Sequence, residues 1–586
     1  MNDHEPSNPS PSDPAEPGES AESAESAEND RRGLTRRGML GASAAAAFLA
    51  GAGGLAAAPA LAGAADRAKF DGQRLVGFGP DAAQRRSAVF RMRVDAARAN
   101  LQGFIGVQMN NGDEGRYADY RASFTKTLPH NAFGEVDPAA YQRLLAAIDS
   151  GEFDDFEQVP LSPQADRKLA NPQGAWKYEI TGRDSHETWM RPAPAFTSAE
   201  TAAEMGEVYW KALLRDVPFS AFDTDSDVAD AIADLNGLSA TVGPTEGGAV
   251  TAGTVFRGET PGDLVGPYIS QFLFKPIPMG NLVIDQRYPT PAPGDDFMTT
   301  QADWLAVQNG VSPPPLAKGN PRYISDARAL GEYVHVDFSY QAYLNAALIL
   351  LATPGVLDVS NPYNGAATQG GFVSLGGPDV LTLVAKAGNL ALTGAWYQKW
   401  LVHRRLRPEV YAGRLHFQMT GDRAYGLPAE IESSLAVART QSRYGTAFLP
   451  MAFPEGSPTH PAYPAGHATI AGACVTVLKA FFEETAILPE PVVAAADGSE
   501  LLAWAGDPLT VGGELNKLAN NIALGRDWAG VHYRSDGVDG LLVGEQQALG
   551  MLADYSRTYT ELFDGFSLTR YDGTPIQVVG GEIIEL

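Results

Sequence analysis

The chain has 586 residues, of which 44% are hydrophobic and 19% are charged, so as a whole it is globular and neither disordered nor fibrous. Asp and Glu outnumber Lys and Arg by 70 to 44, and the net charge of −26 disfavours a broad nucleic-acid interface. The single cysteine, Cys474, excludes an intrachain disulfide and any zinc or iron–sulfur site built from cysteines.

Residues 1–30 contain Pro, Ser, Glu and Asp but no aromatic or branched apolar residue. Such a segment cannot bury enough surface to offset its chain entropy, so we predict a disordered acidic N-terminal tail.

Residues 31–62 resemble a twin-arginine signal peptide. Arg36-Arg37 precede a mildly apolar run rich in Ala and Gly, which ends at the cleavage-site pattern Ala60-Leu61-Ala62. The alternative is a transmembrane anchor, but Ala, Gly and Pro59 give this run a poor insertion energy. We therefore expect export by the twin-arginine machinery to the periplasm or the outside, with no stable membrane anchor.

Residues 63–330 form the predicted N-terminal helical region. Apolar spacing predicts helices over 84–102, 138–150 and 198–215. The segments 223–262 and 288–323 are rich in Gly, Pro, Thr and Asp and predict long loops. A short strand pair is expected near 104–109.

Residues 331–586 form the predicted C-terminal helical-bundle region. Helices are expected over 337–353, 379–406, 466–484, 515–528 and 536–556, with short strands near 575–585. Apolar helices in series with weak strand signals indicate a mainly α, helical-bundle architecture with two packed bundles, long loops and minor short strands.

Three clusters in the C-terminal region carry candidate chemistry. The first places Lys399, His403, Arg404, Arg405 and Arg407 at the end of the 379–406 helix, which Pro408 is expected to stop. Lys399 and Arg407 would lie roughly 80° apart around one helix, so that both reach one anion. The alternative is an ordinary interaction of cations with the helix C-terminal dipole.

The second cluster is SPTHPAYPAGHATIAGA, in which three prolines lead to Gly466 and His467 at a helix start. A helix N-terminus reached through a glycine presents free N–H groups to an anion. The alternative is an ordinary helix start with a packed histidine.

The third cluster is LGRDWAGVHYRSDGVDG, which contains Arg526, His532 and Asp536. The alternatives are a core histidine and a helix-capping aspartate, although Asp536 can cap and orient His532 together. Taken jointly, the clusters gather three histidines, three cations and a glycine amide, which predicts a site for a tetrahedral oxyanion such as phosphate or vanadate.

The clusters resemble the signature of the superfamily that joins vanadium-dependent haloperoxidases with type-2 phosphatidic-acid and bacterial acid phosphatases. That signature, K-x(6–7)-RP, PSGH and SR-x5-H-x3-D, is matched here by KWLVHRRLRP, PAGH and GRDWAGVHYRSD. Seven residues between Lys399 and Arg407, and the string HPAYPAGHA, are similar to the algal-type bromoperoxidases. ASFTKTLPHN, GPYISQFLF and YQAYLNAALILL extend the resemblance over most of the chain after residue 62.

The resemblance implies a role for each position. His532 would be the axial vanadium ligand, and Lys399, Arg407, Arg526 and the Gly466 amide would hold the vanadate oxygens. His467 would be the acid–base partner, Lys399 would also polarise peroxide, and Asp536 would orient His532. His460 occupies the position where bromide-preferring members carry a histidine.

The implied activity is a vanadate-dependent, haem-free oxidation of halide, bromide rather than chloride, by hydrogen peroxide. Its product, hypohalous acid, would halogenate an organic acceptor, and the protein would form a homo-oligomer. Two positions depart from the pattern: Ala465 replaces the signature serine and Gln398 stands where algal enzymes carry arginine. The alternatives are an acid phosphatase with His532 as nucleophile, and an oxyanion- or vanadate-binding homologue that acts without free hypohalite.

Overall fold

The computed structural model describes residues 82–103 and 105–586, and Gln84–Leu586 form one compact unit. The predicted acidic tail and twin-arginine signal lie outside the described residues. The regular structure that is described is mostly helical, which confirms the mainly α class. The predicted boundary between residues 330 and 331 stays a prediction. No helix in the described ranges has both the length and the apolar character that a membrane span requires.

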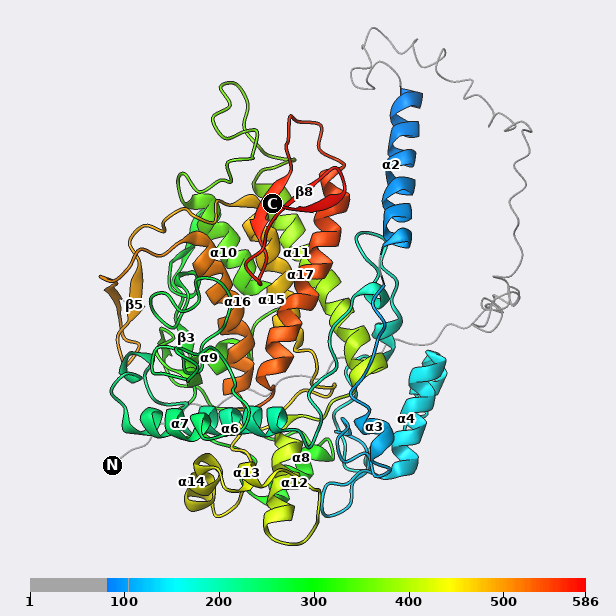
Figure 1. The fold of residues 1–586 in the computed structure, drawn as a ribbon, viewed down its shortest axis with the longest axis vertical. Helices are drawn as coiled ribbons and strands as arrows, with labels where there is room; N and C mark the ends of the chain where they lie inside the picture. Colours follow the sequence, from blue (N-terminus) through cyan, green and yellow to red (C-terminus); the bar gives the residue numbers. More distant parts are fainter. Residues whose placement is uncertain (1–81, 104) are drawn as a thin grey trace, which may run out of the picture. The chain divides into compact units, whose positions relative to one another are not determined.

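The centre of the unit is a bundle of long helices (Figure 1). These are α10 (Gln341–Ala352), α11 (Gly377–Tyr397), α15 (Gly466–Phe481), α16 (Val511–Trp528) and α17 (Arg534–Ser556). Helix α15 packs against α11, α16 and α17, and all of its residues except His467 are buried. A helix that is apolar on all faces is typical of the middle of a bundle.

Helices α15 and α17 approach each other closely because glycines lie in their contact. A Cβ atom on Gly544 would lie 2.0 Å from the carbonyl oxygen of Thr469, and one on Gly472 would lie 2.1 Å from that of Leu541. This close packing fixes the two N-termini side by side, where the amide of Ala465 donates to the carbonyl of Asp536 at 2.8 Å. The second and third sequence clusters therefore meet at this end of the bundle.

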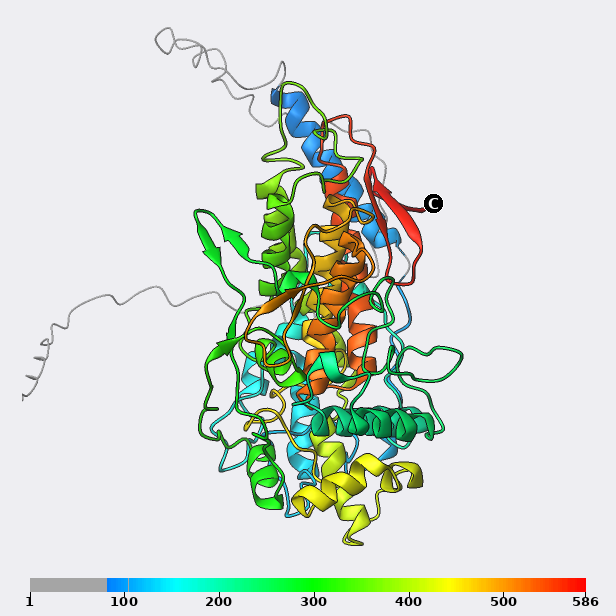
Figure 2. The same cartoon turned by 90° about the vertical axis from the view of Figure 1, so that its left-hand side faces the viewer.

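A second group of helices covers that end. Helix α6 (Ala199–Leu213) runs across it, with α7 (Ser226–Asn236), α12 (Pro408–Met419), α13 (Ala429–Glu432) and α14 (Leu435–Tyr444) around and beyond it (Figures 1 and 2). Ser198 caps α6 by accepting a hydrogen bond from the Thr201 amide. The helix buries charged side chains, among them Glu204, Glu207 and Lys211, beneath the meeting point of the sequence clusters.

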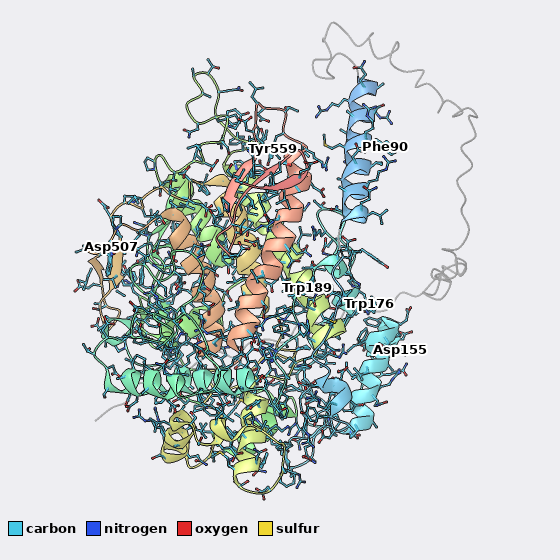
Figure 3. All side chains as sticks on the ribbon, viewed as in Figure 1. Phe90, Asp155, Trp176, Trp189, Asp507 and Tyr559 are labelled. Carbon is cyan, nitrogen blue, oxygen red and sulfur yellow. The ribbon has the colours of Figure 1, made fainter. Side chains whose placement is uncertain are left out.

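The remaining helices, including the long α2, are not part of the central bundle, and several loops contain single 3-10 turns. The helices are α2 (Ala82–Gln102), α3 (Asp113–Arg116), α4 (Pro138–Ser150), α5 (Phe153–Phe156), α8 (Gln301–Gln308) and α9 (Ala327–Tyr333). The 3-10 turns are η2 (Pro172–Trp176), η3 (Ser185–Glu187), η4 (Phe219–Ala221) and η5 (Gln271–Leu273). Side chains fill the spaces between the central helices, whereas Phe90 on α2 is 68% exposed (Figure 3).

The strands form small antiparallel sheets at the periphery. Their pairings are β1 (Ile277–Met279) with β2 (Leu282–Ile284), β3 (Tyr288–Pro289) with β4 (Pro321–Arg322), and β5 (Val492–Ala494) with β6 (Leu501–Ala503). The largest contains β7 (Phe566–Thr569), β8 (Pro575–Val579) and β9 (Glu582–Glu585) in that order. Its register pairs Ile576 with Leu568 and Glu585. Ile576 and Val578 alternate inward and are fully buried.

Most predicted elements are confirmed, and three predictions are wrong in part. The segments 223–262 and 288–323 are not continuous loops, because they contain α7 and α8. Asp225 caps α7, whose buried Val228, Ala231 and Leu235 lie on one face despite the polar composition. Residues 105–109 form no strand, and the helix expected over 337–353 begins only at Gln341.

Candidate functional site

Backbone contacts join the three sequence clusters into one site. The ammonium group of Lys399 donates to the carbonyls of Pro461 and Ala462 at 2.7 and 2.8 Å. The guanidinium of Arg407 donates to the carbonyls of His460 and Val531 at 2.9 and 2.8 Å. The first cluster thereby contacts both the second and the third, in agreement with the prediction that the three clusters form one site.

Lys399 and Arg407 do not share a helix, which corrects the predicted geometry. Helix α11 ends at Tyr397, and a π-helical segment, η6 (Gln398–His403), carries Lys399. The chain then leaves the helix at Arg404, whose φ is 40°, and α12 begins at Pro408. Proline is favoured at the first position of a helix, so Pro408 starts a helix here and does not stop one. The two cations converge because the chain turns between them.

The site brings together three cations that have no carboxylate partner. Lys399, Arg407 and Arg526 are buried. No Asp or Glu of the described residues forms an ion pair with any of them, whereas nearby Lys211, Arg405 and Arg534 each contact a buried carboxylate. The Nε of Arg526 is buried and has no hydrogen-bond partner among the described residues. Buried cations gathered without counter-charge form a site for an anion.

The shifted pKa values of these three cations also indicate a site for an anion. Burial, reinforced by the charge of Arg407, holds the pKa of Lys399 well below its usual range. Burial also lowers the pKa of Arg407 to about 9 and that of Arg526 to about 10. An anion bound among these groups would favour their charged forms and return each pKa toward its ordinary value.

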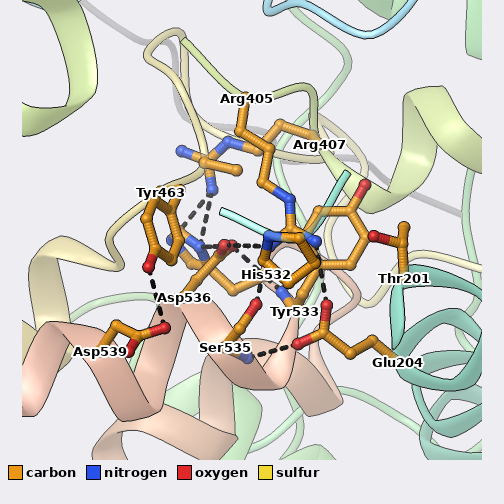
Figure 4. Close-up of polar contacts among 12 residues, drawn as sticks. Thr201, Glu204, Arg405, Arg407, Tyr463, His532, Tyr533, Ser535, Asp536 and Asp539 are labelled. Atoms are coloured by element: carbon orange, nitrogen blue, oxygen red, sulfur yellow. Dashed lines mark hydrogen bonds and ion pairs between the residues drawn. The ribbon is translucent and has the colours of Figure 1, made fainter. Parts of the chain in front are cut away.

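His532 is buried beside Arg407 and Asp536 (Figure 4), and the charges of Lys399 and Arg526 also act on it. Its Nδ1 lies 2.7 Å from Oδ2 of Asp536, and its Nε2 lies 2.9 Å from Nη1 of Arg407. Since a guanidinium only donates, Nε2 is the acceptor and Nδ1 carries the proton. Burial and the neighbouring cations hold the pKa of His532 well below its usual range, so the ring is neutral. A neutral imidazole whose unprotonated nitrogen faces the site can bind a metal once Arg407 turns to the bound anion.

Asp536 is held by further contacts of its own. Its Oδ1 accepts from Nη1 of Arg405 at 2.9 Å, and its Oδ2 also accepts from the amide of Tyr533 at 3.2 Å (Figure 4). Tyr533, not Asp536, is the N-cap of α17, and Asp536 is the third helical residue of the capping box. Asp536 therefore helps to cap the helix and contacts His532, but it does so from the third position of the helix and not as the N-cap.

The N-terminus of α15 opens into the site without a side-chain cap. Ala465 is the N-cap residue, and its side chain cannot accept a hydrogen bond from the first amides of the helix. The Gly466 amide and the positive end of the helix dipole remain available to an anion. His467 stands in the first turn, where its Nε2 lies 2.9 Å from Oδ1 of Asp337 and its side chain is 29% exposed.

His460 lies beside Arg407, as the clusters predict. Its Nδ1 is 3.0 Å from Nη2 of Arg407, and its ring lies 4.8 Å from that of Trp396. Burial, together with Lys399 and Arg407, holds the pKa of His460 well below its usual range. His403, by contrast, packs edge-on against the ring of Tyr463 and does not contact these cations.

Sequence reasoning missed the carboxylates that support the site. Asp337 contacts His467, and Glu204 of α6 pairs with Arg405, which in turn contacts Asp536 (Figure 4). Asp337 lies four residues before the start of the apolar helix α10, and an acid at this place was the one local signal that pointed to it. Glu204 is buried on α6. Because buried acids are usually paired, this residue indicates a cationic partner, but the sequence does not show which one.

The arrangement is suited to a tetrahedral oxyanion that also accepts a nitrogen ligand. Three cations and the α15 N-terminus would hold its oxygens, and Nε2 of His532 would approach its central atom. Among residues 82–103 and 105–586, no three His, Cys, Asp or Glu side chains gather as a site for a metal cation. The donor set therefore fits a metal held as an oxyanion such as vanadate, and it equally fits phosphate.

Comparisons with known proteins agree with this chemistry. The family model described as "VCPO second helical-bundle domain" matches residues 379–560, which hold every cation and histidine of the site. A vanadium-dependent bromoperoxidase of Corallina pilulifera is 35% identical over 84% of this chain and 98% of its own length. One from Ascophyllum nodosum is 36% identical over 82% of this chain and 90% of its own length. A solved homohexameric vanadate-dependent bromoperoxidase of Ascophyllum nodosum superposes with a TM-score of 0.82 at 32% identity, covering 89% of this chain and 98% of that one.

Proposed function

The chain belongs to the vanadium-dependent bromoperoxidase family, and we propose that it oxidises bromide with hydrogen peroxide, with vanadate as its cofactor. The product, hypobromous acid or its equivalent, then halogenates an organic acceptor. The observation that carries this function is the buried cluster of Lys399, Arg407 and Arg526 without carboxylates around the unprotonated Nε2 of His532, which accepts from Arg407.

Each site residue has a distinct part in holding the cofactor. Nε2 of His532 would bind vanadium, and the three cations and the Gly466 amide would hold its oxygens. Bound vanadate supplies a Lewis acid that activates peroxide without changing the oxidation state of the metal. Asp536 keeps the proton on Nδ1 of His532 and so keeps Nε2 unprotonated, a support that commonly accompanies histidine ligands.

The remaining residues act on protons, peroxide and halide. His467 faces the solvent-accessible side of the site, where Asp337 fixes its ring and it exchanges a proton with incoming peroxide. Lys399 is a buried donor that polarises peroxide held beside it. His460, next to Arg407 and the Trp396 ring, lies on the side from which we propose that bromide approaches.

We expect vanadate to restore activity to protein from which oxyanions have been removed, and phosphate to oppose it. Both anions are tetrahedral and would bind the same cations, but only vanadate activates peroxide. Bromination of a phenolic dye with peroxide and bromide measures the recovery, and a titration with phosphate measures the competition. Recovery with iron or zinc but not with vanadate would contradict the proposal. Hydrolysis of a chromogenic phosphate without bromination would indicate the phosphatase alternative.

We further propose that residues 31–62 direct export by the twin-arginine route to the periplasm or the outside, which the paired arginines support. Replacing Arg36 and Arg37 with lysines should retain the protein in the cytoplasm, because a receptor reads the pair. Immunoblots of cell fractions measure the distribution, and secretion at the wild-type level would point to another route.

We also propose that the protein is a homo-oligomer. The solved Ascophyllum nodosum relative is a homohexamer, and this chain covers 98% of it. Light scattering of the purified protein measures its mass directly, and a monomeric mass would exclude this assembly.

A further inference from the structure

One short segment contacts two residues of the site at once. The segment 334–337 follows α9, and the carbonyl of Val334 accepts from Nη1 of Arg526 at 2.6 Å. Oδ1 of Asp337, at the other end of the segment, lies 2.9 Å from Nε2 of His467. The position of this segment therefore sets both a cation that holds the oxyanion and the acid–base histidine.

The contact with Val334 is decisive for Arg526. It is the one hydrogen bond that the guanidinium makes to the described residues, and the Nε has none. The second support is the ring of Phe453, whose centroid lies 5.6 Å from Cζ of Arg526. Because arginine has several rotatable bonds, its direction depends on how firmly these two supports are held.

His335 holds both supports. It follows Val334 in the chain, and its ring stacks on Phe453 with 3.7 Å between centroids and 9° between planes. Its Nδ1 lies 3.2 Å from Oε2 of Glu332, and its Nε2 lies 2.6 Å from Oε1 of Glu455. The ring is thus anchored at both nitrogens and on one flat face.

The geometry requires a protonated ring. Ionised carboxylates only accept hydrogen bonds, so both nitrogens of His335 must donate, which only the imidazolium can do. Burial alone would lower the pKa of His335, but Glu332 and Glu455 raise it above its ordinary value. Lys318 pairs with the other oxygen of Glu332, and Arg167 donates to the Glu455 carbonyl at 3.0 Å. Lys126, whose pKa is lowered by burial to about 8, also donates to the Glu455 carbonyl at 2.9 Å. The charged groups around the ring are therefore two acids, with Lys318, Arg167, Lys126 and Arg526 beyond them.

We propose that His335 is a positioning residue that clamps the segment 334–337 and Phe453 between Glu332 and Glu455, and thereby aims Arg526 and His467 at the bound oxyanion. The proposal rests on the proposed function, because it assigns Arg526 and His467 to a vanadate site. It adds His335 to His460, His467 and His532 as a fourth histidine, one that never touches the cofactor but determines how tightly the cofactor is held.

His335→Phe should bind vanadate about tenfold more weakly, the effect of loosening one hydrogen bond to a charged group. Phenylalanine retains the stacking on Phe453 but donates no hydrogen bond. Calorimetry with vanadate and separately with inorganic phosphate measures the affinity without relying on turnover. His416→Phe is the matched control, because His416 also packs on a phenylalanine, Phe448 at 4.4 Å, but lies outside the site. The control should bind both anions as the wild type does.

The pH dependence separates positioning from a general loss of stability. A pKa raised by folding means that the clamp is present below about pH 6.5, the ordinary pKa of histidine, and is lost as pH rises through the raised value. The affinity ratio of wild type to His335→Phe should therefore be largest at acid pH and should fall as pH rises through the raised pKa of His335. The titration of the anion itself is common to both proteins and cancels in the ratio.

Glu455→Gln serves as the second variant if His335→Phe does not fold. It should weaken vanadate binding in the same direction by a smaller factor, because the amide retains an acceptor but not the charge. Equal affinity of the wild type and both variants at all pH values would overturn the inference. A wild type that binds neither vanadate nor phosphate would instead overturn the proposed function.

Discussion

Replacing His532 with alanine is expected to abolish vanadate-dependent bromide oxidation. Its Nε2 is the nitrogen assigned as the vanadium ligand, so alanine would leave the vanadate held by charge alone. The loss should exceed about 100-fold, which is the upper range for removing a group that only supports a metal ligand. Dye bromination at saturating vanadate measures the loss, and circular dichroism checks that the fold remains.

Two further variants make this test specific. Asp536→Asn retains the ligand but offers His532 a weaker and neutral acceptor, so a smaller loss of about 10–100-fold is expected. His416→Ala removes a histidine outside the site and should retain full activity. If His532→Ala retained wild-type turnover, or if His416→Ala lost as much as His532→Ala, the assignment of His532 as ligand would be wrong.

The site residues were predictable because their spacing along the chain is local. His532 and Asp536 lie one helical turn apart, and Gly466 precedes His467 directly, so the sequence alone places each pair together. The convergence of the three clusters was predicted from chemistry, because basic residues gathered in an acidic chain indicate a bound anion. The hydrogen bond from the Ala465 amide to the Asp536 carbonyl shows that packing of α15 on α17 brings the second and third clusters together.

The supporting residues were not predictable because their partners are distant in sequence. Asp337 lies 130 residues from His467, and Glu204 lies 201 residues from Arg405. Nothing local distinguishes such an acid from any other, because its partner is chosen by the packing of separate helices. The same limit explains the error at Pro408, where only the turn after His403 shows that the proline begins a helix.

The short helices α7 and α8 were missed for a different reason. Their segments contain enough Gly, Pro, Thr and Asp to resemble loops as a whole. Within its segment, however, α7 has an apolar face and an aspartate cap. Composition averaged over a long window thus conceals a helix of only a few turns. The peripheral strands are equally short, and pairs such as β5 and β6 carry too few residues to show a clear alternation.

His467→Ala is expected to slow peroxide-dependent bromide oxidation by about 10²–10⁴-fold, the usual contribution of general acid–base assistance. Vanadate affinity should change by much less, because Lys399, Arg407, Arg526 and His532 all remain in place. Stopped-flow bromination over a range of peroxide concentrations measures the first effect, and calorimetry with vanadate measures the second.

The carboxylate of Asp337 provides the internal check on this assignment. It fixes the His467 ring at 2.9 Å, so Asp337→Asn should slow the reaction less than His467→Ala, and the double variant should be no slower than His467→Ala alone. Such non-additivity is expected when one residue acts through the other. If the two losses multiplied instead, Asp337 would act independently of His467. If His467→Ala weakened vanadate binding as much as His532→Ala, His467 would help to hold the cofactor and would not be the proton carrier.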